Sequence, residues 1–244
     1  MDVPADRTVE TLRRAFETWG LPGRIRVDNG HPWVSPTGDL PTELGLWLLG
    51  LGIELVPNRV RRPEDNGAVE SSQRTGQRWA DPPRCGSAAE LQRRLDAMDR
   101  HQREWFPDAA HSRLRLFPGL AHSGRAYHRA AEASWWQPAR VREGLAGYAV
   151  VRQVNARGLV SVYGRNYPVA RKYAGESVYV RLDAESGDWL IELPDGPLIG
   201  RHPAELSREA ILGRRVTRRH HGRARIGDER RGGGEGTATP PAHR

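Results

Sequence analysis

Between residues 8 and 105 the sequence alternates between segments with helical periodicity and very short apolar segments typical of β-strands. The predicted order is a helix over 8–19, a strand over 25–27, a helix over 40–51, a strand over 53–56, and helices over 66–79 and 87–105. This alternation predicts an α/β layer with helices packed on a sheet. A stable sheet commonly has ~4–6 strands, so residues 1–106 are expected to form only part of a domain.

Two expectations about packing follow from the same segments. The segment 40–51 is apolar on most sides, so we expect it to be buried. Trp79 and Trp105 close the last two predicted helices, and we expect both to pack against other side chains.

The pattern changes after Pro107. Residues 107–146 hold many Arg, His and aromatic side chains, and we expect a linker that packs on one or both of its neighbours. Short β-type segments with Gly-containing turns follow at 148–154, 159–163, 177–182, 189–193 and 198–200. We therefore predict a small all-β barrel over 147–212.

The positive charge is concentrated at the C-terminal end. The formal charge is +8, and residues 213–244 supply +6 of it through nine Arg against three acidic residues. We expect 213–244 to be a disordered tail that adds salt-sensitive affinity for DNA. Lys172 is the only lysine. The high share of Arg suits phosphate recognition, and the base composition of a GC-rich genome explains it equally well.

Composition also argues against several classes of protein. Cys85 is the only cysteine, which excludes an internal disulfide and cysteine-based zinc or iron–sulfur sites. No run of eighteen apolar residues is present, so no membrane span is expected. The first residues lack the pattern of a secretory signal, and we expect a cytoplasmic protein.

Two carboxylates stand out by their context. Asp28 follows the predicted strand 25–27, and α/β proteins place ligands at that end of a strand. Glu70 lies near the start of the helix 66–79. The intervening helix, strand and loop could bring the two together, and a pair of carboxylates suits Mg²⁺. The alternatives are that Asp-Asn-Gly is a turn sequence and that Glu is favoured early in any helix.

Five arginines surround Glu70 in the sequence. They are Arg59, Arg61, Arg62, Arg74 and Arg78. Such a group suits a phosphate-rich substrate, and we take these residues as candidate DNA contacts. A solvated helix face with ion pairs between residues four apart explains them equally well.

Three segments carry a resemblance to a known family. Residues 27–33 (VDNGHPW), 51–59 (LGIELVPNR) and 63–70 (PEDNGAVE) closely resemble the catalytic core of DDE transposases and retroviral-type integrases. The resemblance covers roughly residues 8–105. The segment 147–212 resembles the small SH3-like β-barrel that follows such cores in bacterial insertion-sequence and Mu-type transposases.

The resemblance implies a partial ribonuclease H-like fold and DNA strand cleavage and transfer. Asp28 matches the family's second catalytic Asp, and Glu70 matches its catalytic Glu. In the family three carboxylates hold two Mg²⁺ (or Mn²⁺) ions, about 3.5–4 Å apart, which activate the attacking oxygen and stabilise the leaving oxygen. The implied partners are transposon ends and target DNA, with a second copy or a full-length transposase.

The sequence departs from the family before Asp28. The first catalytic Asp normally lies on an earlier strand, and Asp2 and Asp6 precede a helix instead. We therefore expect an N-terminally truncated transposase that lacks strand-transfer activity alone. The alternative is a DNA-binding or regulatory remnant without catalysis, and a third possibility is a gene fragment that aggregates through its open sheet edge.

Overall fold

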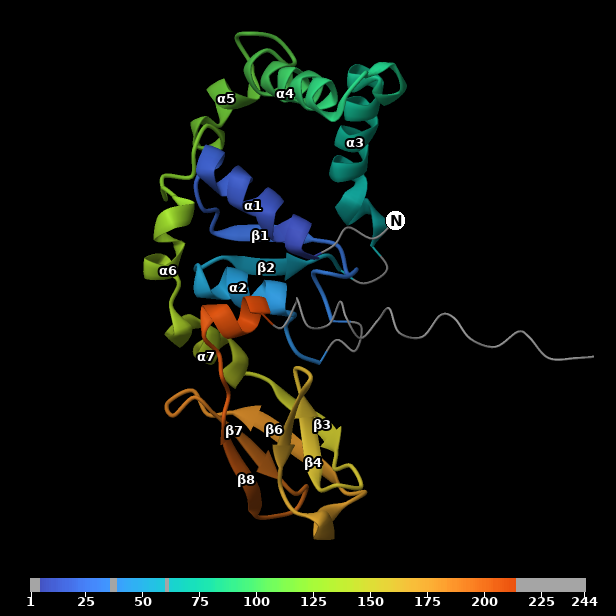
Figure 1. Ribbon diagram of the computed structural model, residues 1–244. Coiled ribbons are helices and arrows are strands. Elements are labelled where there is room, and N and C mark those ends of the chain that lie inside the picture. The colour runs from blue at the N-terminus through green and yellow to red at the C-terminus, as the bar shows by residue number, and fades with distance from the viewer. Residues whose placement is uncertain (1–4, 36–38, 60–61, 214–244) are drawn as a thin grey trace, which may run out of the picture.

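The computed structural model describes residues 5–35, 39–59 and 62–213 and shows a chain of mixed helix and sheet (Figure 1). Its first elements are α1 (Ala5–Trp19), β1 (Arg24–Val27), α2 (Glu43–Gly50) and β2 (Glu54–Pro57). Thr42 begins α2, where its side-chain hydroxyl accepts a hydrogen bond from the Gly45 amide at 3.1 Å. All four elements were predicted from the sequence.

The strands β1 and β2 form a two-stranded parallel sheet. Arg24 pairs with Glu54 at one end of the register, and Val27 pairs with Pro57 at the other. The two strands lie between α1 and α2 (Figure 1). Nearly all of α2 is buried, including Leu44, Leu46 and Trp47, each 0% exposed, as its apolar composition predicts.

A helical arm projects from this part of the molecule (Figure 1). It consists of the short 3-10 turn η1 (Pro63–Asn66), α3 (Gly67–Ala80), a second turn η2 (Pro82–Arg84) and α4 (Ala88–Glu104). The two helices meet where Gly76 faces Leu95 and Met98. None of the residues of α4 is buried. The expectation that Trp79 packs is confirmed, because its ring stacks on His101 of α4 with the ring centroids 5.1 Å apart, although Trp79 stays 47% exposed. Trp105 is 57% exposed, against the same expectation.

The predicted linker is helical and packs on the first part of the chain. It contains α5 (Arg113–Leu116), the turns η3 (Pro118–Leu120) and η4 (Arg129–Ala131), α6 (Glu132–Trp135) and α7 (Pro138–Ala146). Val141 and Leu145 of α7 are fully buried. The Trp136 indole donates a hydrogen bond to the Trp47 carbonyl at 3.1 Å. These contacts confirm the predicted packing against a neighbour.

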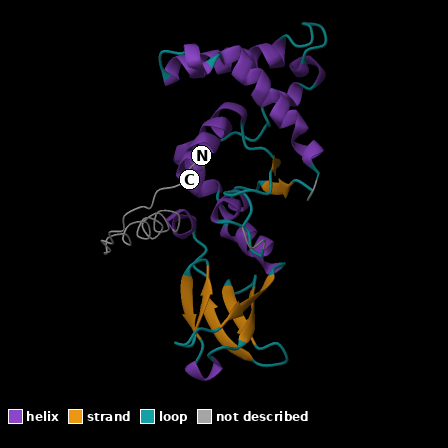
Figure 2. Ribbon diagram, turned by 90° about the vertical axis from the view of Figure 1, so that its right-hand side faces the viewer, coloured by secondary structure: helices purple, strands orange, loops and turns teal. Residues whose placement is uncertain are grey.

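The strands of the second part gather at one end of the molecule (Figure 2). They are β3 (Ala149–Gln153), β4 (Leu159–Val162), β5 (Arg165–Pro168), β6 (Ser177–Leu182), β7 (Asp188–Glu192) and β8 (Leu198–Pro203), with the turn η5 (Arg171–Tyr173) between β5 and β6. One antiparallel sheet has the order β3-β6-β7-β8, and a second pairs β4 with β5. Tyr163 and Gly164 connect β4 to β5 with positive φ angles of 49° and 76°, typical of a two-residue hairpin turn.

The strands end before the boundary predicted at residue 212. The last strand ends at Pro203, and residues 208–213 form a helix that lies beside α7 and α2 (Figure 1). Ile211 on this helix is fully buried. The chain therefore leaves the helical part after α7, forms the strands and returns.

The helical and strand parts share one hydrophobic core, which runs from Val9 to Ile211. Two polar contacts also join them: the Tyr163 hydroxyl donates to the Pro41 carbonyl at 2.8 Å, and Arg152 pairs with Asp39 at 2.7 Å. Within the described residues, none of the helices has both the length and the apolar composition needed to cross a bilayer. The predicted basic tail lies outside the described residues from residue 214 onward.

Candidate functional site

The carboxyl ends of β1 and β2 place two of the predicted site segments side by side. Val27 and Pro57 are partners in the parallel register, so the two strands end together. The Asn58 amide then donates to the Val27 carbonyl at 2.9 Å, which extends the pairing by one residue. Asp28 and Asn58 therefore begin adjacent loops at one edge of the sheet, where α/β proteins bind ligands.

Three asparagines link these loops to the start of α3. The Asn29 side-chain amide donates to the Asn58 carbonyl at 3.0 Å. The Asn58 side-chain amide donates in turn to the Asn66 side-chain oxygen at 2.5 Å. We call this set the asparagine ladder. It joins the loop of Asp28, the end of β2 and the helix of Glu70.

Asn58 is the central member of the ladder. It is only 9% exposed, and its Oδ1 atom has no hydrogen-bond partner among the described residues. Buried polar atoms without partners are uncommon, and each calls for a physical explanation. Sequence reasoning used the motifs that contain these asparagines but did not single out their side chains. The available signal was the recurrence of Asn at all three motifs.

Asp28 is exposed and forms a local turn. The Gly30 amide donates to its Oδ1 at 3.0 Å. The alternative interpretation of Asp-Asn-Gly as a turn sequence is therefore realised. This bond uses one oxygen of the carboxylate and leaves the side chain at the surface.

Glu70 is also exposed and lies in the first turn of α3. A carboxylate there is favoured by the positive end of the helix dipole, with or without a ligand. Among the described residues, the ion pairs do not include Glu70 with Arg74 or Arg78. The helix face is solvated, as the alternative interpretation states, but its ion pairs between residues four apart are not formed here.

The structure brings the segments of Asp28 and Glu70 to one side of the sheet without forming a complete set of metal ligands. In the part of the chain that the structure describes, no group of three or more His, Cys, Asp or Glu side chains could hold a metal ion. The donor chemistry of the two carboxylates nevertheless suits a hard divalent cation.

Two of the predicted basic residues form ion pairs. Arg59 forms a bidentate ion pair with Asp65, with N–O distances of 2.7 and 3.1 Å, and Arg62 pairs with Glu64 at 3.1 Å. Hydrogen bonds from the Arg59 side chain and amide lower the pKa of Asp65 to about 2. Sequence reasoning missed Asp65 as the partner of Arg59.

The remaining basic residues lie elsewhere on the arm. Arg74 and Arg78 are exposed along α3. Arg61 lies outside the described residues. Among the described residues of this set, Arg74 and Arg78, on successive turns of the helix that carries Glu70, are therefore the exposed arginines outside the ion pairs.

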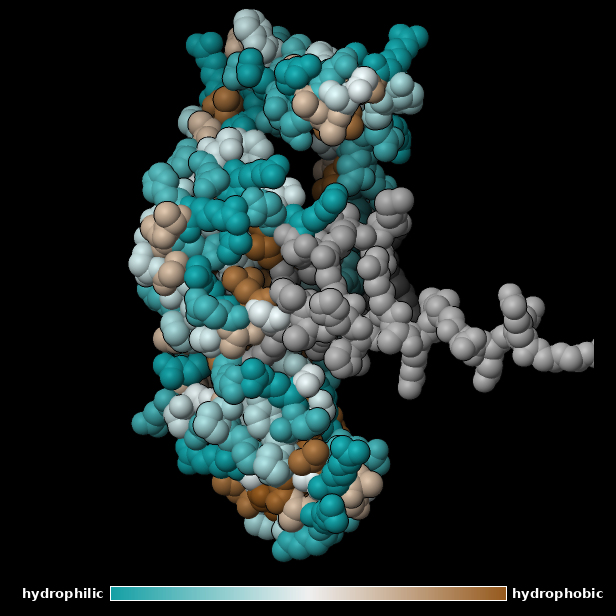
Figure 3. Space-filling model, viewed as in Figure 1, coloured by the Kyte–Doolittle hydropathy of each residue, from teal (hydrophilic) through white to brown (hydrophobic). Residues whose placement is uncertain are grey.

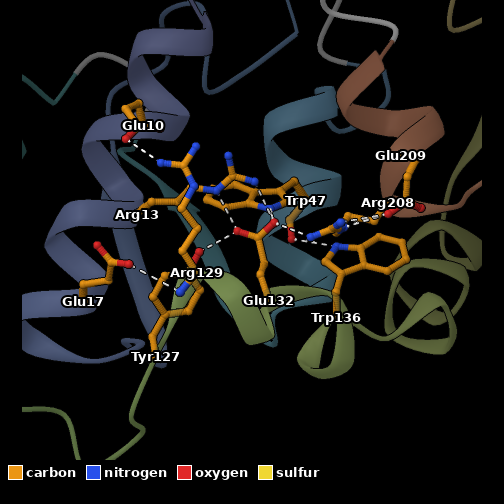
Figure 4. Close-up of polar contacts among 10 residues, drawn as sticks. All are labelled: Glu10, Arg13, Glu17, Trp47, Tyr127, Arg129, Glu132, Trp136, Arg208 and Glu209. Carbon is orange, nitrogen blue, oxygen red and sulfur yellow. Dashed lines mark hydrogen bonds and ion pairs between the residues drawn. The ribbon is translucent and has the colours of Figure 1, made fainter.

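A second cluster of charges is buried between distant parts of the chain (Figure 4). Glu132 on α6 is 0% exposed and accepts two hydrogen bonds from Arg13 on α1, both at 2.7 Å. Tyr127 donates to it at 2.5 Å, Trp47 at 3.3 Å and Arg208 at 3.0 Å. We call these five residues the Glu132 cluster.

The Glu132 cluster keeps its central carboxylate ionised. Burial alone would raise the pKa of Glu132, but hydrogen bonds from Arg13 and Tyr127 outweigh it and lower the pKa. Burial and the bond to Glu132 raise the pKa of Tyr127. All its members face one another rather than the surface, so the cluster holds the fold together. Sequence reasoning gave no signal for it.

No protein-family model matches this chain. The functional argument therefore rests on the residues and their geometry.

Proposed function

We propose that this chain acts on DNA as part of a DDE-type transposition or integration protein, a polynucleotidyl transferase. The single observation that carries the proposal is the asparagine ladder, which ties the loop of Asp28 to the helix of Glu70. These segments are the ones whose sequences resemble the family's catalytic core. The proposed fold is a partial ribonuclease H-like layer built on β1 and β2, followed by an SH3-like barrel built on β3–β8.

Asp28 and Glu70 would hold Mg²⁺ or Mn²⁺ in this proposal. Both are exposed carboxylates, and the neighbouring Asn58 Oδ1 is an amide oxygen without a hydrogen-bond partner among the described residues. When bound, such ions polarise phosphate oxygens and activate an attacking water or hydroxyl. Enzymes of this type use three carboxylates, and these residues supply two. We therefore expect no strand cleavage by this chain alone.

The first test is calorimetric titration of Mn²⁺ and Mg²⁺ into the chain. Asp28→Asn and Glu70→Gln should each weaken binding at least about tenfold, or ~1.4 kcal/mol, because each removes a charged oxygen ligand. The matched control is Glu104→Gln, an exposed carboxylate at the far end of α4, which should bind as the parent does. Equal binding by all four proteins would show that Asp28 and Glu70 hold no cation.

A DNA-binding protein without catalysis is the second candidate, and the free guanidinium groups of α3 support it. Arg74 and Arg78 are exposed and are not among the ion-paired arginines of the described residues. If they contact phosphates, Arg74→Gln and Arg78→Gln should each weaken duplex binding. Each should also reduce the slope of log affinity against log salt concentration by about one. Duplex binding that persists while the cation titration fails would favour this candidate. The proposed partners are DNA ends and target DNA, with a second copy or a full-length transposase.

A further inference from the structure

Most of the exposed Trp and Phe rings among the described residues lie in one segment of the chain. Every Trp or Phe that is exposed in the described residues is either Trp19 or lies between Trp79 and Phe117. Trp105, Phe106 and Phe117 are 57%, 45% and 62% exposed. Figure 3 shows apolar surface over α5, surrounded by hydrophilic side chains. Such side chains are costly to leave in water, so their clustering indicates an interaction site.

Arginines accompany these rings. The Arg113 guanidinium lies over the Phe106 ring, 5.7 Å from its centroid. Arg113 and Arg115 are exposed and are absent from the ion pairs of the described residues, whereas Arg103 nearby pairs with Asp99. A guanidinium that stacks through its face keeps its N–H edges available for phosphate. We call Trp105, Phe106, Arg113, Arg115 and Phe117 the α4–α5 corner.

The local charge is positive. Residues 100–125 contain five Arg and three His against two acidic residues. The ligand of the α4–α5 corner should therefore be anionic and should also offer flat apolar faces.

We propose that the α4–α5 corner binds single-stranded DNA. Unpaired bases stack on the exposed rings, while Arg113 and Arg115 contact the phosphates. Stacking platforms combined with cationic side chains are how proteins bind single strands without sequence preference. A duplex keeps its base faces covered and offers only phosphates and groove edges. The inference rests on the proposed function, since strand transfer exposes single-stranded ends.

A second copy of the chain is a poorer occupant. A two-fold interface brings the same patch of both subunits together. The positively charged α4–α5 corner of one copy would then face that of the other, and like charges at an interface are unfavourable. A nucleic acid strand meets the same surface with complementary charge.

The test is fluorescence anisotropy with the full chain and a labelled oligothymidylate of about 20 nucleotides, compared with a duplex of equal length. Trp105→Ala and Phe117→Ala should each weaken single-strand binding about tenfold and leave duplex binding within about twofold. Trp105→Tyr should restore most of the affinity. Tyr179→Ala, which removes another exposed ring, 42% exposed, from β6, is the matched control and should have no effect.

Three outcomes would overturn the proposal. The first is oligothymidylate binding by a Trp105→Ala/Phe117→Ala double variant at parent affinity. The second is an equal loss of single-strand and duplex binding, which would point to a general electrostatic effect. The third is light scattering that shows a dimer dissociated by the double variant while single-strand binding persists. Duplex binding and Mn²⁺ titration of the same variants report on the proposed function separately.

Discussion

At the scale of single residues, the burial and partners of Glu132 predict a large effect on stability. Its carboxylate is fully buried and meets two guanidinium groups, a hydroxyl and an indole. Replacing a buried charged partner leaves the remaining charges uncompensated, and this costs far more than loss of a surface ion pair. Arg13 and Arg208 are the groups that would be left, with side chains only 16% and 23% exposed.

Glu132→Gln should therefore lower the free energy of unfolding by about 3–5 kcal/mol, measured by urea denaturation. The matched control is Glu209→Gln, whose carboxylate is 70% exposed and pairs with the same Arg208; it should change stability by less than about 0.5 kcal/mol. Equal effects of the two substitutions would contradict the role of burial.

The same cluster predicts a direction for the pH dependence. The folded state holds the pKa of Glu132 below the ordinary value of 4.5. A lowered carboxylate pKa contributes stability above the unfolded value, and that stability is lost as pH falls through the folded pKa. The difference in stability between the parent and Glu132→Gln should therefore shrink below pH 4.5. A difference that grows on acidification would be inconsistent with a lowered pKa.

At the scale of elements, Trp136, which lies between α6 and α7, packs directly against the backbone of α2. A β-carbon built on Gly50 would lie 2.0 Å from the Trp136 Nε1 atom and 2.2 Å from its Cε2 atom. The indole therefore occupies the space that any larger residue would need. Trp136 is 6% exposed and donates to the Trp47 carbonyl, so it cannot move aside freely.

Gly50→Ala should therefore destabilise the protein by about 1–3 kcal/mol through overpacking, although alanine is normally the better helix former. Gly147→Ala is the matched control. Gly147 follows α7 with a negative φ of −76°, and nothing lies within 4 Å of its added methyl group. Chemical denaturation of both variants measures the difference, and stabilisation by Gly50→Ala would show that the indole relocates.

At the scale of the whole molecule, the helical and strand parts should unfold together. One hydrophobic core contains residues of both parts, and Tyr163–Pro41 and Arg152–Asp39 add polar contacts between them. Calorimetry should give one transition with equal calorimetric and van't Hoff enthalpies. Two separated transitions would show that the strand part is an independent domain.

The local sequence determined most elements of the first half. Apolar periodicity predicted α1, β1, α2 and β2, and the composition of α2 predicted its burial, because each signal lies within one element. It failed for β5, whose residues Arg165–Pro168 lack an alternating pattern and become a strand only by pairing with β4. The motifs supplied the segments around Asp28 and Glu70 and the recurring Asn, but the hydrogen bonds of the asparagine ladder depend on how these segments meet in the fold.

Tertiary structure alone decided which polar residues became central. Glu132 lies in an unremarkable Ala-rich stretch, and its partners Arg13, Trp47 and Arg208 are 119, 85 and 76 residues away. No local pattern can encode such a meeting, because it depends on how the helices pack. The same reason explains why Trp79 and Trp105 stay 47% and 57% exposed: α3 and α4 pack on each other and on short neighbouring elements, which leaves much of both rings in water.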